Sequence, residues 1–353
     1  MNQTVRVLVI DDSAYNRRTI IKLLEEIPGV TVVGYACNGE EGLRKFFDLQ
    51  PDLVTLDLEM PRIDGFGFLR IVMQNRPTPV IVISSLADDE NVFKAMELGA
   101  VDFVAKPTSR ISPELVNIRD DLLAKVMETA RTDMNKVLRR PSARDRVREA
   151  ATGPMSTFIP RSNGLGQIVI GASTGGPPAL QSLLSSITDP LPLGIAISQH
   201  MPPVFTRAFA ERLNKFCALE VKEAQTGDLM LPGRVLIAPG GKNLTFQVRA
   251  GNVVALVEDP PPNQRYTPSV DVMFKSASDV FGANLLGVVL TGMGNDGARG
   301  VERIKEHGGQ VLAESEESSI VFGMPKEAIA TGKVDKVLPL SLMAGEVLRR
   351  CGF

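Results

Sequence analysis

Short runs of β-branched and aliphatic residues alternate along this chain with segments whose apolar residues recur every three or four positions. The first kind of run predicts buried strands, and the second predicts amphipathic helices. The alternation extends from Val5 to Val104 and resumes after Gly166. Because repeated strand–helix units build parallel sheets covered on both faces, we expect an α/β protein with two doubly wound parallel-sheet domains.

The stretch between the two alternating regions differs in composition. Residues 125–163 carry nine Lys and Arg against four Asp and Glu, then turn rich in Gly, Ser and Pro without clear periodicity. Residues 1–124 are acidic, with 13 basic against 19 acidic residues, and residues 164–353 are near neutral, with 17 against 18. We therefore expect two domains over the outer ranges and a linker over 125–163. The basic run is typical of a solvated tether. Alternatively, the linker docks on an acidic partner or on the acidic first domain.

Composition also excludes several classes of protein. The three cysteines (Cys37, Cys217 and Cys351) are far apart, which excludes a disulfide framework and any C-x-x-C motif and suits a reducing compartment. The start resembles no signal peptide, and no uncharged run is apolar enough to span a membrane. With 5% aromatic residues and no Trp, stacking on nucleic acid is not expected. We predict a cytoplasmic protein with no membrane insertion and no nucleic-acid partner.

Polar residues follow four of the expected strands in the first region. Asp11 and Asp12 follow the first strand, Asp57 the third, Ser84 the fourth and Lys106 the fifth. In a sheet of order 2-1-3-4-5 these strand ends lie at the edge where ligands bind. Three carboxylates gathered there favour a hard cation such as Mg²⁺. Asp57 would then accept a phosphoryl group, paired with Lys106 and hydrogen-bonded to Ser84.

The first region as a whole resembles the receiver domain of two-component response regulators. Besides the residues at the strand ends, Asp64-Gly65 matches the usual loop of that family, and Phe103 matches its switch aromatic. The resemblance implies a five-stranded flavodoxin-like fold and phosphorylation of Asp57 by a histidine kinase. It also implies that Asp11, Asp12 and Asp57 hold Mg²⁺.

The glycine-rich segment Gly171–Pro178 opens the second region. It follows an expected strand over Gln167–Ile170 and precedes a helical pattern, so its glycines permit a tight strand-to-helix turn. It lacks the lysine of a P-loop and the G-x-G-x-x-G spacing, but it fits G-x-S-x-G around Ser173. A serine nucleophile, an anion-binding loop and a plain turn are all compatible with this segment alone.

A serine nucleophile needs a base, and the chain contains two histidines. His200 lies just past an expected strand, whereas His307 lies at a helix end before two glycines, where histidine is structurally routine. Asp296 follows another expected strand and can orient an imidazole. Ser173, His200 and Asp296 would thus share the carboxyl edge of one sheet. The chain order differs from the Ser…Asp…His order of α/β-hydrolases, which would use His307 instead.

Several motifs of the second region, in order, look like those of the bacterial chemotaxis protein-glutamate methylesterases. They are G-A-S-T-G-G-P (Gly171–Pro177), Q-H-M-P-P-x-F-T (Gln199–Thr206), A-P-G-G (Ala238–Gly241), P-S-V-D (Pro268–Asp271), T-G-M-G-N-D-G (Thr291–Gly297) and G-M-P (Gly323–Pro325). The resemblance implies hydrolysis of γ-glutamyl methyl esters on chemoreceptor helices, with release of methanol, and deamidation of receptor glutamines. It implies no cofactor for the hydrolysis, a chemotaxis histidine kinase as phosphodonor, and Ser173, His200 and Asp296 as a triad with Thr174 and Met293 near the oxyanion.

The chain departs from the family pattern at Asn243-Leu244, where His-Met is common, and at Thr267, where Arg often precedes the proline. We expect both positions to line the substrate groove. The strand-like runs 234–238, 244–249 and 253–257 predict an antiparallel hairpin added to the parallel sheet. Ser269 is expected to cap a helix that ends at Phe281, with packing as its main role.

Two other functions are compatible with this organisation: a catalytically weak receptor-array adaptor and a related esterase of a non-chemotaxis sensory system. A DNA-binding output domain would be shorter and strongly basic, which residues 164–353 are not. For regulation, we expect the unmodified receiver to cover the Ser173 site and phosphorylation of Asp57 to release it.

Overall fold

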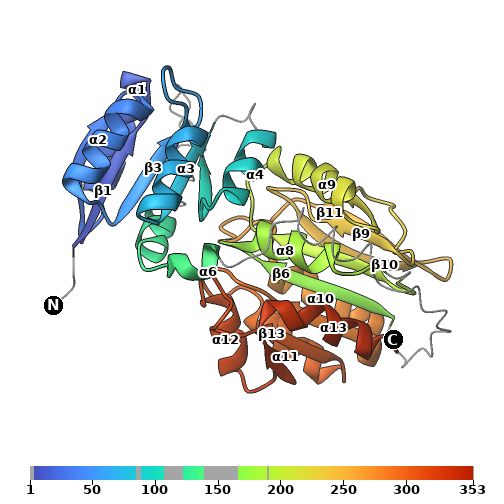
Figure 1. Ribbon diagram of the computed structural model, residues 1–353. Helices are drawn as coiled ribbons and strands as arrows, with labels where there is room; N and C mark the ends of the chain where they lie inside the picture. The colour runs from blue at the N-terminus through green and yellow to red at the C-terminus, as the bar shows by residue number, and fades with distance from the viewer. Residues whose placement is uncertain (1–3, 85–88, 107–121, 139–165, 189–190, 353) are drawn as a thin grey trace. The chain divides into compact units, whose positions relative to one another are not determined.

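The computed structural model describes residues 4–84, 89–106, 122–138, 166–188 and 191–352 (Figure 1). Contacts within the chain divide it into two compact units, residues 1–139 and 140–353, and each unit is described by itself. Among the described residues, no helix has the length and apolar character needed to cross a bilayer.

Unit 1 contains a five-stranded parallel sheet of order β2-β1-β3-β4-β5, as the sequence predicts. The strands are β1 (Val5–Ile10), β2 (Val30–Ala36), β3 (Leu53–Asp57), β4 (Val80–Ser84) and β5 (Asp102–Ala105). The helices that alternate with them are α1 (Ala14–Glu25), α2 (Gly39–Leu49), α3 (Gly65–Asn75) and α4 (Asp89–Glu97).

Polar caps start the helices of unit 1 close behind the strand ends. Ser13, Asn38 and Asp64 each accept a hydrogen bond from a backbone N–H in the first turn of α1, α2 and α3. Gly65 is required beside Asp64, because a Cβ there would lie 2.4 Å from the carbonyl oxygen of Asp57. The Asp-Gly pair therefore lets α3 begin directly against the end of β3.

The first part of the expected linker belongs to unit 1. Residues 122–129 are helical, and α6 (Met134–Leu138) follows them. Leu122 and Val126 are buried in the same core cluster as β1 and α1, which keeps these residues on the sheet. Ordered structure therefore extends past the expected boundary at residue 124. Residues 139–163, the remainder of the expected linker, lie outside the described residues.

Unit 2 is built on a seven-stranded parallel sheet of order β14-β13-β12-β6-β7-β9-β8. Its strands are β6 (Gln167–Ala172), β7 (Gly194–Gln199), β8 (Glu220–Glu223), β9 (Arg234–Ile237), β12 (Leu285–Val289), β13 (Gln310–Glu314) and β14 (Lys336–Leu338). Because the chain continues from β6 to β7 on one side and β12 pairs with β6 on the other, the topological switch point lies at the carboxyl end of β6.

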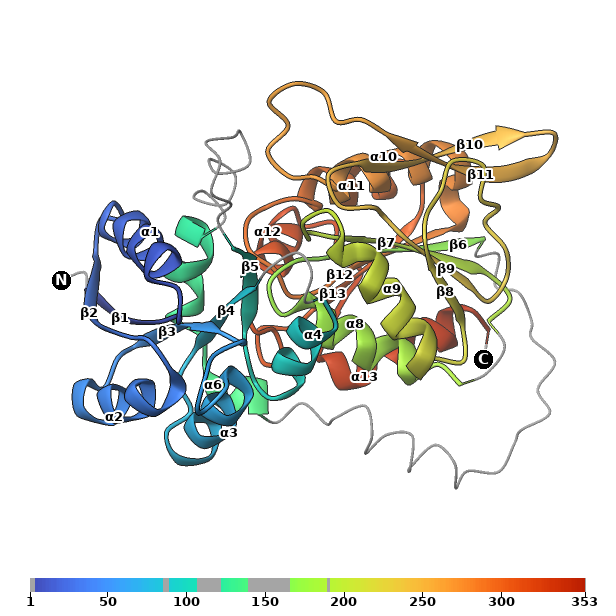
Figure 2. The same ribbon diagram turned by 90° about the horizontal axis from the view of Figure 1, so that it is seen from above.

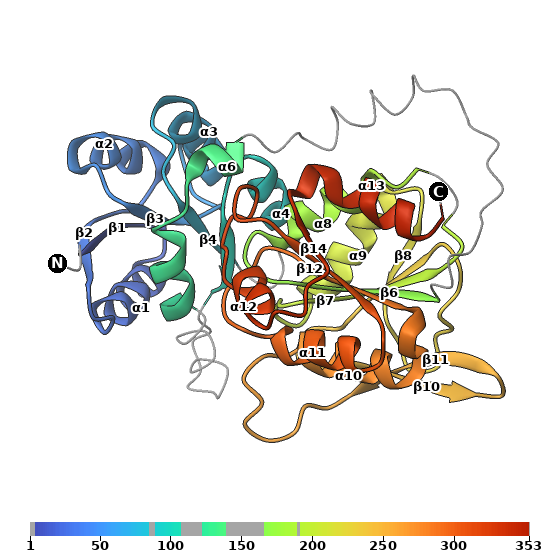
Figure 3. The same cartoon turned by 90° about the horizontal axis from the view of Figure 1, so that it is seen from below.

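Helices cover both faces of this sheet. They are α8 (Gly176–Ser185), α9 (Phe205–Phe216), α10 (Val270–Phe281), α11 (Ala298–Glu306), α12 (Met324–Ala330) and α13 (Leu340–Arg350), with a 3₁₀ turn over Gly282–Asn284. Figures 2 and 3 show α8, α9 and α13 on one face and α10 and α11 on the other. Two doubly wound domains were predicted, and both are present.

The predicted hairpin is present, but it has fewer strands than the sequence indicated. β10 (Asn243–Arg249) and β11 (Asn252–Glu258) pair antiparallel and form a two-stranded sheet of their own that packs on α10. The run at 234–238 is instead β9, a parallel strand between β7 and β8. Its residues Val235–Ile237 are fully buried, which suits a central strand covered on both faces better than a hairpin edge.

Candidate active site

Three loops of unit 2 meet at the switch point, and each follows a strand of the sheet. Ala172 and Gln199 are register partners on β6 and β7, so Ser173 and His200 are the next residues on adjacent strands. The backbone N–H of His200 donates to the carbonyl of Ala172 (3.0 Å). The backbone N–H of Ser173 donates to the carbonyl of Thr291 (3.0 Å), at the end of β12. Segments far apart in sequence are thereby joined at one edge.

The imidazole of His200 contacts the carboxylate of Asp296. The distance from His200 Nε2 to Asp296 Oδ2 is 2.8 Å, and the side chains are 14% and 3% exposed. Since Nε2 faces a carboxylate, it carries the proton and donates it in this hydrogen bond. Nδ1 is therefore the ring nitrogen left to accept a proton from another group.

Asp296 is held by the N-terminus of α10. Its carboxylate accepts hydrogen bonds from the hydroxyl of Ser269 (3.0 Å) and from the backbone N–H groups of Val270 (2.7 Å) and Asp271 (2.9 Å). Burial alone would raise the pKa of Asp296, but the interaction with His200 and the backbone donors outweigh it and lower the pKa. The unpaired N–H groups and the dipole of a helix N-terminus favour a carboxylate in the same direction. Asp296 therefore stays ionised at neutral pH.

The first turn of α10 and the loop of Asp296 hold each other. Asp271 Oδ1 accepts hydrogen bonds from the backbone N–H groups of Gly297 (2.9 Å) and Gly300 (2.7 Å), at the start of α11. Burial and the charge of Asp296 raise the pKa of Asp271. Ser269 caps α10 as predicted, but it also donates to Asp296, a contact that sequence reasoning missed when it assigned this helix to packing. The P-S-V-D motif, which contains Ser269, was the sequence signal that pointed to a role of this segment in the site.

Ser173 lies in a buried turn. The side-chain amide of Gln199 donates to the carbonyls of Ser173 and His200, each at 3.0 Å, and so ties the two turns together. Gly176 makes room for that amide, because a Cβ there would lie 2.0 Å from Gln199 Oε1. Gly175, at φ +73°, supplies the left-handed residue before α8.

The two residues expected near an oxyanion lie in this same region. Thr174 is buried, and its carbonyl accepts a hydrogen bond from the Thr291 hydroxyl (2.9 Å). Met293 is half-buried in the loop after β12. That loop is fixed by the G-M-P motif, since the backbone N–H groups of Gly323 (3.1 Å) and Met324 (2.8 Å) both donate to the carbonyl of Gly292.

His307 lies away from this edge. It caps the C-terminus of α11, where its Nδ1 is 3.0 Å from the carbonyl of Arg303, and its Nε2 is 3.6 Å from Asp279. The nine residues of α11 separate it from the Asp296 loop by roughly 14 Å along the helix axis. Its contacts are those of a structural helix-end histidine.

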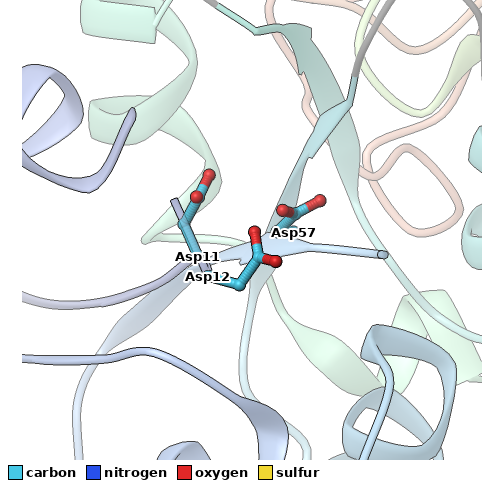
Figure 4. A group of neighbouring side chains, drawn as sticks. All are labelled: Asp11, Asp12 and Asp57. Carbon is cyan, nitrogen blue, oxygen red and sulfur yellow. The ribbon is translucent and has the colours of Figure 1, made fainter. Parts of the chain in front are cut away.

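In unit 1, three carboxylates gather at the carboxyl ends of β1 and β3. Asp11, Asp12 and Asp57 each offer an oxygen within 4.8 Å of the others (Figure 4). Lys106 Nζ lies 2.8 Å from Asp57 Oδ2. Burial, together with the charge of Asp57, raises the pKa of Asp11 to about 6. Burial also raises the pKa of Asp57, whereas the contact with Asp57 outweighs burial and raises the pKa of Lys106.

The remaining predicted residues of this site, Ser84 and Phe103, belong to the neighbouring strands β4 and β5. Ser84 ends β4 and is buried, and its carbonyl accepts the backbone N–H of Lys106 (2.7 Å). Phe103 is buried edge-on against Phe93, with 6.5 Å between the ring centroids. Lys125 Nζ donates to the carbonyl of Phe103 (2.7 Å), so the helix over 122–129 is tied to β5. Sequence reasoning did not anticipate this last contact.

Comparisons with known proteins agree with this two-part organisation. Residues 7–116 match the response regulator receiver domain, which places the chain in the class of response regulators, and residues 168–347 match the CheB methylesterase domain. The chain belongs to the CheB methylesterase family.

Two relatives are similar over nearly the whole chain. A Geobacter sulfurreducens protein named protein-glutamate methylesterase/protein-glutamine glutaminase 3 is 54% identical, over 99% of this chain and 98% of its own. A Myxococcus xanthus protein of the same name, numbered 1, is 49% identical over 95% and 94%. The crystal structure of the Thermotoga maritima CheB methylesterase catalytic domain is 37% identical, with a TM-score of 0.51, over 52% of this chain and 98% of that one. The family resemblance predicted from the motifs is confirmed.

The contact between Ser269 and Asp296 generates a first prediction. Ser269→Ala removes one donor to the carboxylate and the cap of α10, so we expect esterase turnover to fall about tenfold and the unfolding free energy by ~1 kcal/mol. Ser278→Ala is the matched control, because Ser278 is buried in the same helix and donates to Phe274 O, away from the site. Methanol release measures the turnover of both variants, and calorimetric unfolding measures their stability. Equal turnover of the two variants would contradict the prediction.

Proposed function

We propose that this chain hydrolyses γ-glutamyl methyl esters on the cytoplasmic helices of methylated chemoreceptors, releases methanol and deamidates receptor glutamines, under control of phosphorylation at Asp57. Membership of the CheB methylesterase family and the names of the relatives support this activity. The observation that carries the mechanism is the 2.8 Å contact between His200 and Asp296, at the strand end beside Ser173.

The proposed mechanism assigns one task to each group. Ser173 Oγ attacks the ester carbonyl while His200 accepts its proton at Nδ1, and Asp296 keeps the other ring nitrogen protonated and stabilises the imidazolium. The tetrahedral intermediate collapses to an acyl-serine, and methanol leaves with the proton from His200. Water then attacks the acyl group by the same route, which releases the glutamate carboxylate. A glutamine side chain would follow the same steps and release ammonia.

The negative charge of the tetrahedral intermediate needs hydrogen-bond donors. We assign this role to the turns that carry Thr174 and Met293, because both follow strands at the edge that carries Ser173. Loss of one donor of this kind typically costs ~3 to 4 kcal/mol of transition-state stabilisation. The serine, imidazole and carboxylate supply nucleophile, base and orienting group, so we propose no cofactor for the hydrolysis.

The roles of the two histidines generate the second prediction. We expect Ser173→Ala and His200→Ala each to reduce methanol release from methylated receptor membranes by on the order of 10⁴-fold, because each removes a group that acts in the chemical step. His307→Ala is the control and should keep wild-type activity. Activity lost in His307→Ala but kept in His200→Ala would instead support the Ser…Asp…His order of α/β-hydrolases.

For the receiver, we propose that Asp57 accepts a phosphoryl group from a chemotaxis histidine kinase and that Asp11, Asp12 and Asp57 hold Mg²⁺. The fit is supported by an all-oxygen donor set and by Asp11 Oδ2, which is buried and has no hydrogen-bond partner among the described residues. When bound, Mg²⁺ neutralises the carboxylates and the phosphoryl oxygens. Asp57 is the nucleophile, and Lys106 shifts its ion pair to the added phosphoryl group.

The crowded carboxylates generate the third prediction, for the metal-free protein. Asp11→Asn should raise the unfolding free energy of the receiver at pH 7.5 by up to about 3 kcal/mol, because the pKa of Asp11 rises from 3.8 to about 6 and ionised Asp11 therefore costs free energy. Because the penalty for ionised Asp11 develops as pH rises from about 4 to about 6, the difference in unfolding free energy should fall to roughly 0.5 kcal/mol at pH 4.

Calorimetric unfolding in EDTA at pH 7.5 and pH 4 measures this difference. Asp48→Asn, at an exposed position of α2, is the control for removal of a single carboxylate. The same Asp11→Asn protein should take up less phosphoryl group than wild type when Mg²⁺ is present. A variant that is less stable than wild type at pH 7.5 would show that no repulsion is relieved.

For regulation, we propose that the unphosphorylated receiver inhibits the esterase and that phosphorylation relieves the inhibition. Phosphorylation adds about 1.5–2 negative charges at Asp57. To change the inhibited fraction from roughly 99% to 1%, this modification must favour the active state by about 5.5 kcal/mol. A smaller coupling would give partial activation.

The fourth prediction concerns this inhibition. Deletion of residues 1–140 should raise methanol release above that of the intact, unphosphorylated chain, because it removes the inhibiting domain. Asp57→Asn in the intact chain should keep the low activity whether or not a phosphodonor is supplied. Esterase assays on receptor membranes compare the three proteins. If the truncated protein is no more active than the intact one, the receiver does not act by inhibition.

A further inference from the structure

Tyr266 stacks on the imidazole of His200. The two ring centroids lie 4.9 Å apart, and the ring planes differ by only 4°. Tyr266 belongs to the segment 259–269, which connects β11 to α10 and so leads directly into the helix that holds Asp296. The nearly parallel, offset arrangement is one that aromatic rings favour. The predicted triad did not include this residue.

The hydroxyl of Tyr266 does not explain its position. Tyr266 Oη is buried and has no hydrogen-bond partner among the described residues. It abuts Gly294, where a Cβ would lie 2.3 Å from that oxygen. Gly294 is in the loop between Met293 and Asp296, so the ring spans the space from the imidazole to this loop. The contact that the tyrosine makes with the site is therefore a contact of its ring.

The backbone of Tyr266 is held in place by a pair of side-chain amides, of which Asn243 is buried and Gln264 half-buried. Asn243 and Gln264 exchange two side-chain hydrogen bonds of 2.9 Å each, and Gln264 Nε2 also donates to the carbonyl of Tyr266 (2.6 Å). Asn243 Oδ1 accepts the backbone N–H of Ser269 as well (3.1 Å). Asn243 is 4% exposed, so this position supports the segment of Tyr266 and Ser269.

The hydrogen bond to Asp296 by itself does not fix the orientation of an imidazole. A single hydrogen bond at Nε2 fixes one atom, and the ring can still rotate about that bond because terminal sp³–sp² torsions are broad. A parallel ring laid against one face removes that freedom, since rotation of the imidazole would bring its edge into the neighbouring ring. With the plane fixed, Nδ1 keeps one direction.

We infer that Tyr266 is a positioning residue for the base: its ring fixes the plane of the His200 imidazole so that Nδ1 stays directed to its proton donor while Nε2 stays bonded to Asp296. This inference rests on the proposed role of His200. It assigns the effect to the ring and none of it to the hydroxyl.

Substitutions at Tyr266 in the full-length protein separate ring from hydroxyl. Tyr266→Phe should keep kcat within twofold, because the lost hydroxyl makes no hydrogen bond. Tyr266→Leu should lower kcat for methanol release roughly 3- to 10-fold with little change in KM, as expected for loss of an aromatic contact that orients the base. Phe216→Leu, at a half-buried aromatic of α9, is the matched control and should be unchanged. Wild-type kcat in Tyr266→Leu, or equal losses in the Phe and Leu variants, would overturn the inference.

The two histidines of the chain allow a measurement that does not depend on activity. With ¹³C/¹⁵N-labelled histidine the protein gives two imidazole spin systems, and His307→Ala identifies which is which. In wild type and in Tyr266→Phe, His200 should give narrow imidazole signals from a single tautomer that is protonated at Nε2. In Tyr266→Leu the imidazole signals of His200 should broaden, because the ring moves, whereas the signals of His307 should stay unchanged.

An unchanged His200 spectrum in Tyr266→Leu would overturn the positioning role. Failure of the proposed function has a different signature, since it would appear as an active His200→Ala protein whatever the spectrum of the Tyr266→Leu variant. The two failures are therefore distinguishable.

Discussion

The sheet edge in unit 2 where Ser173 and His200 lie depends on the carboxylate of Asp296 and the donors that hold it. Three hydrogen bonds from the first turn of α10 and one from His200 converge on the two oxygens of this buried group. Each donor stabilises the ionised form, which offsets the cost of burying the charge. Because the carboxylate is fixed and ionised, it fixes both the tautomer and the position of the imidazole, and Tyr266 fixes the ring plane.

Strand-end aspartates in the two units meet opposite environments, and their chemistry differs accordingly. Asp296 has a donor for each oxygen, and its pKa is lowered. Asp11 is buried beside Asp57, one of its oxygens has no partner among the described residues, and its pKa is raised. The first arrangement is complete without a ligand and suits a permanent orienting group. The second is relieved by a cation, which suits a site that binds a metal and then a phosphoryl group.

The sequence predicted what depends on local pattern. Both parallel sheets and the residues at their carboxyl ends follow from the alternation of strand and helix patterns. The order of the first sheet follows from the resemblance to receiver domains. The placement of the run at 234–238 was wrong, because a hairpin and a buried parallel strand share the same apolar pattern and only tertiary pairing separates them. The helix over 122–129 belongs to unit 1, although it lies within a stretch whose basic composition indicated a tether.

The contacts that orient the site escaped prediction for a related reason. Asn243, Gln264, Tyr266 and Ser269 act through pairs whose partners come from different segments, and of the four only Ser269 lies in a family motif, P-S-V-D. All are contributed by the hairpin and the segment inserted between β9 and α10. The parallel sheet therefore brings Ser173, His200 and Asp296 to one edge, whereas the insertion supplies Ser269 and Tyr266, which contact Asp296 and His200. A sheet without the insertion would bring His200 to the same edge but leave its imidazole without a stacking partner.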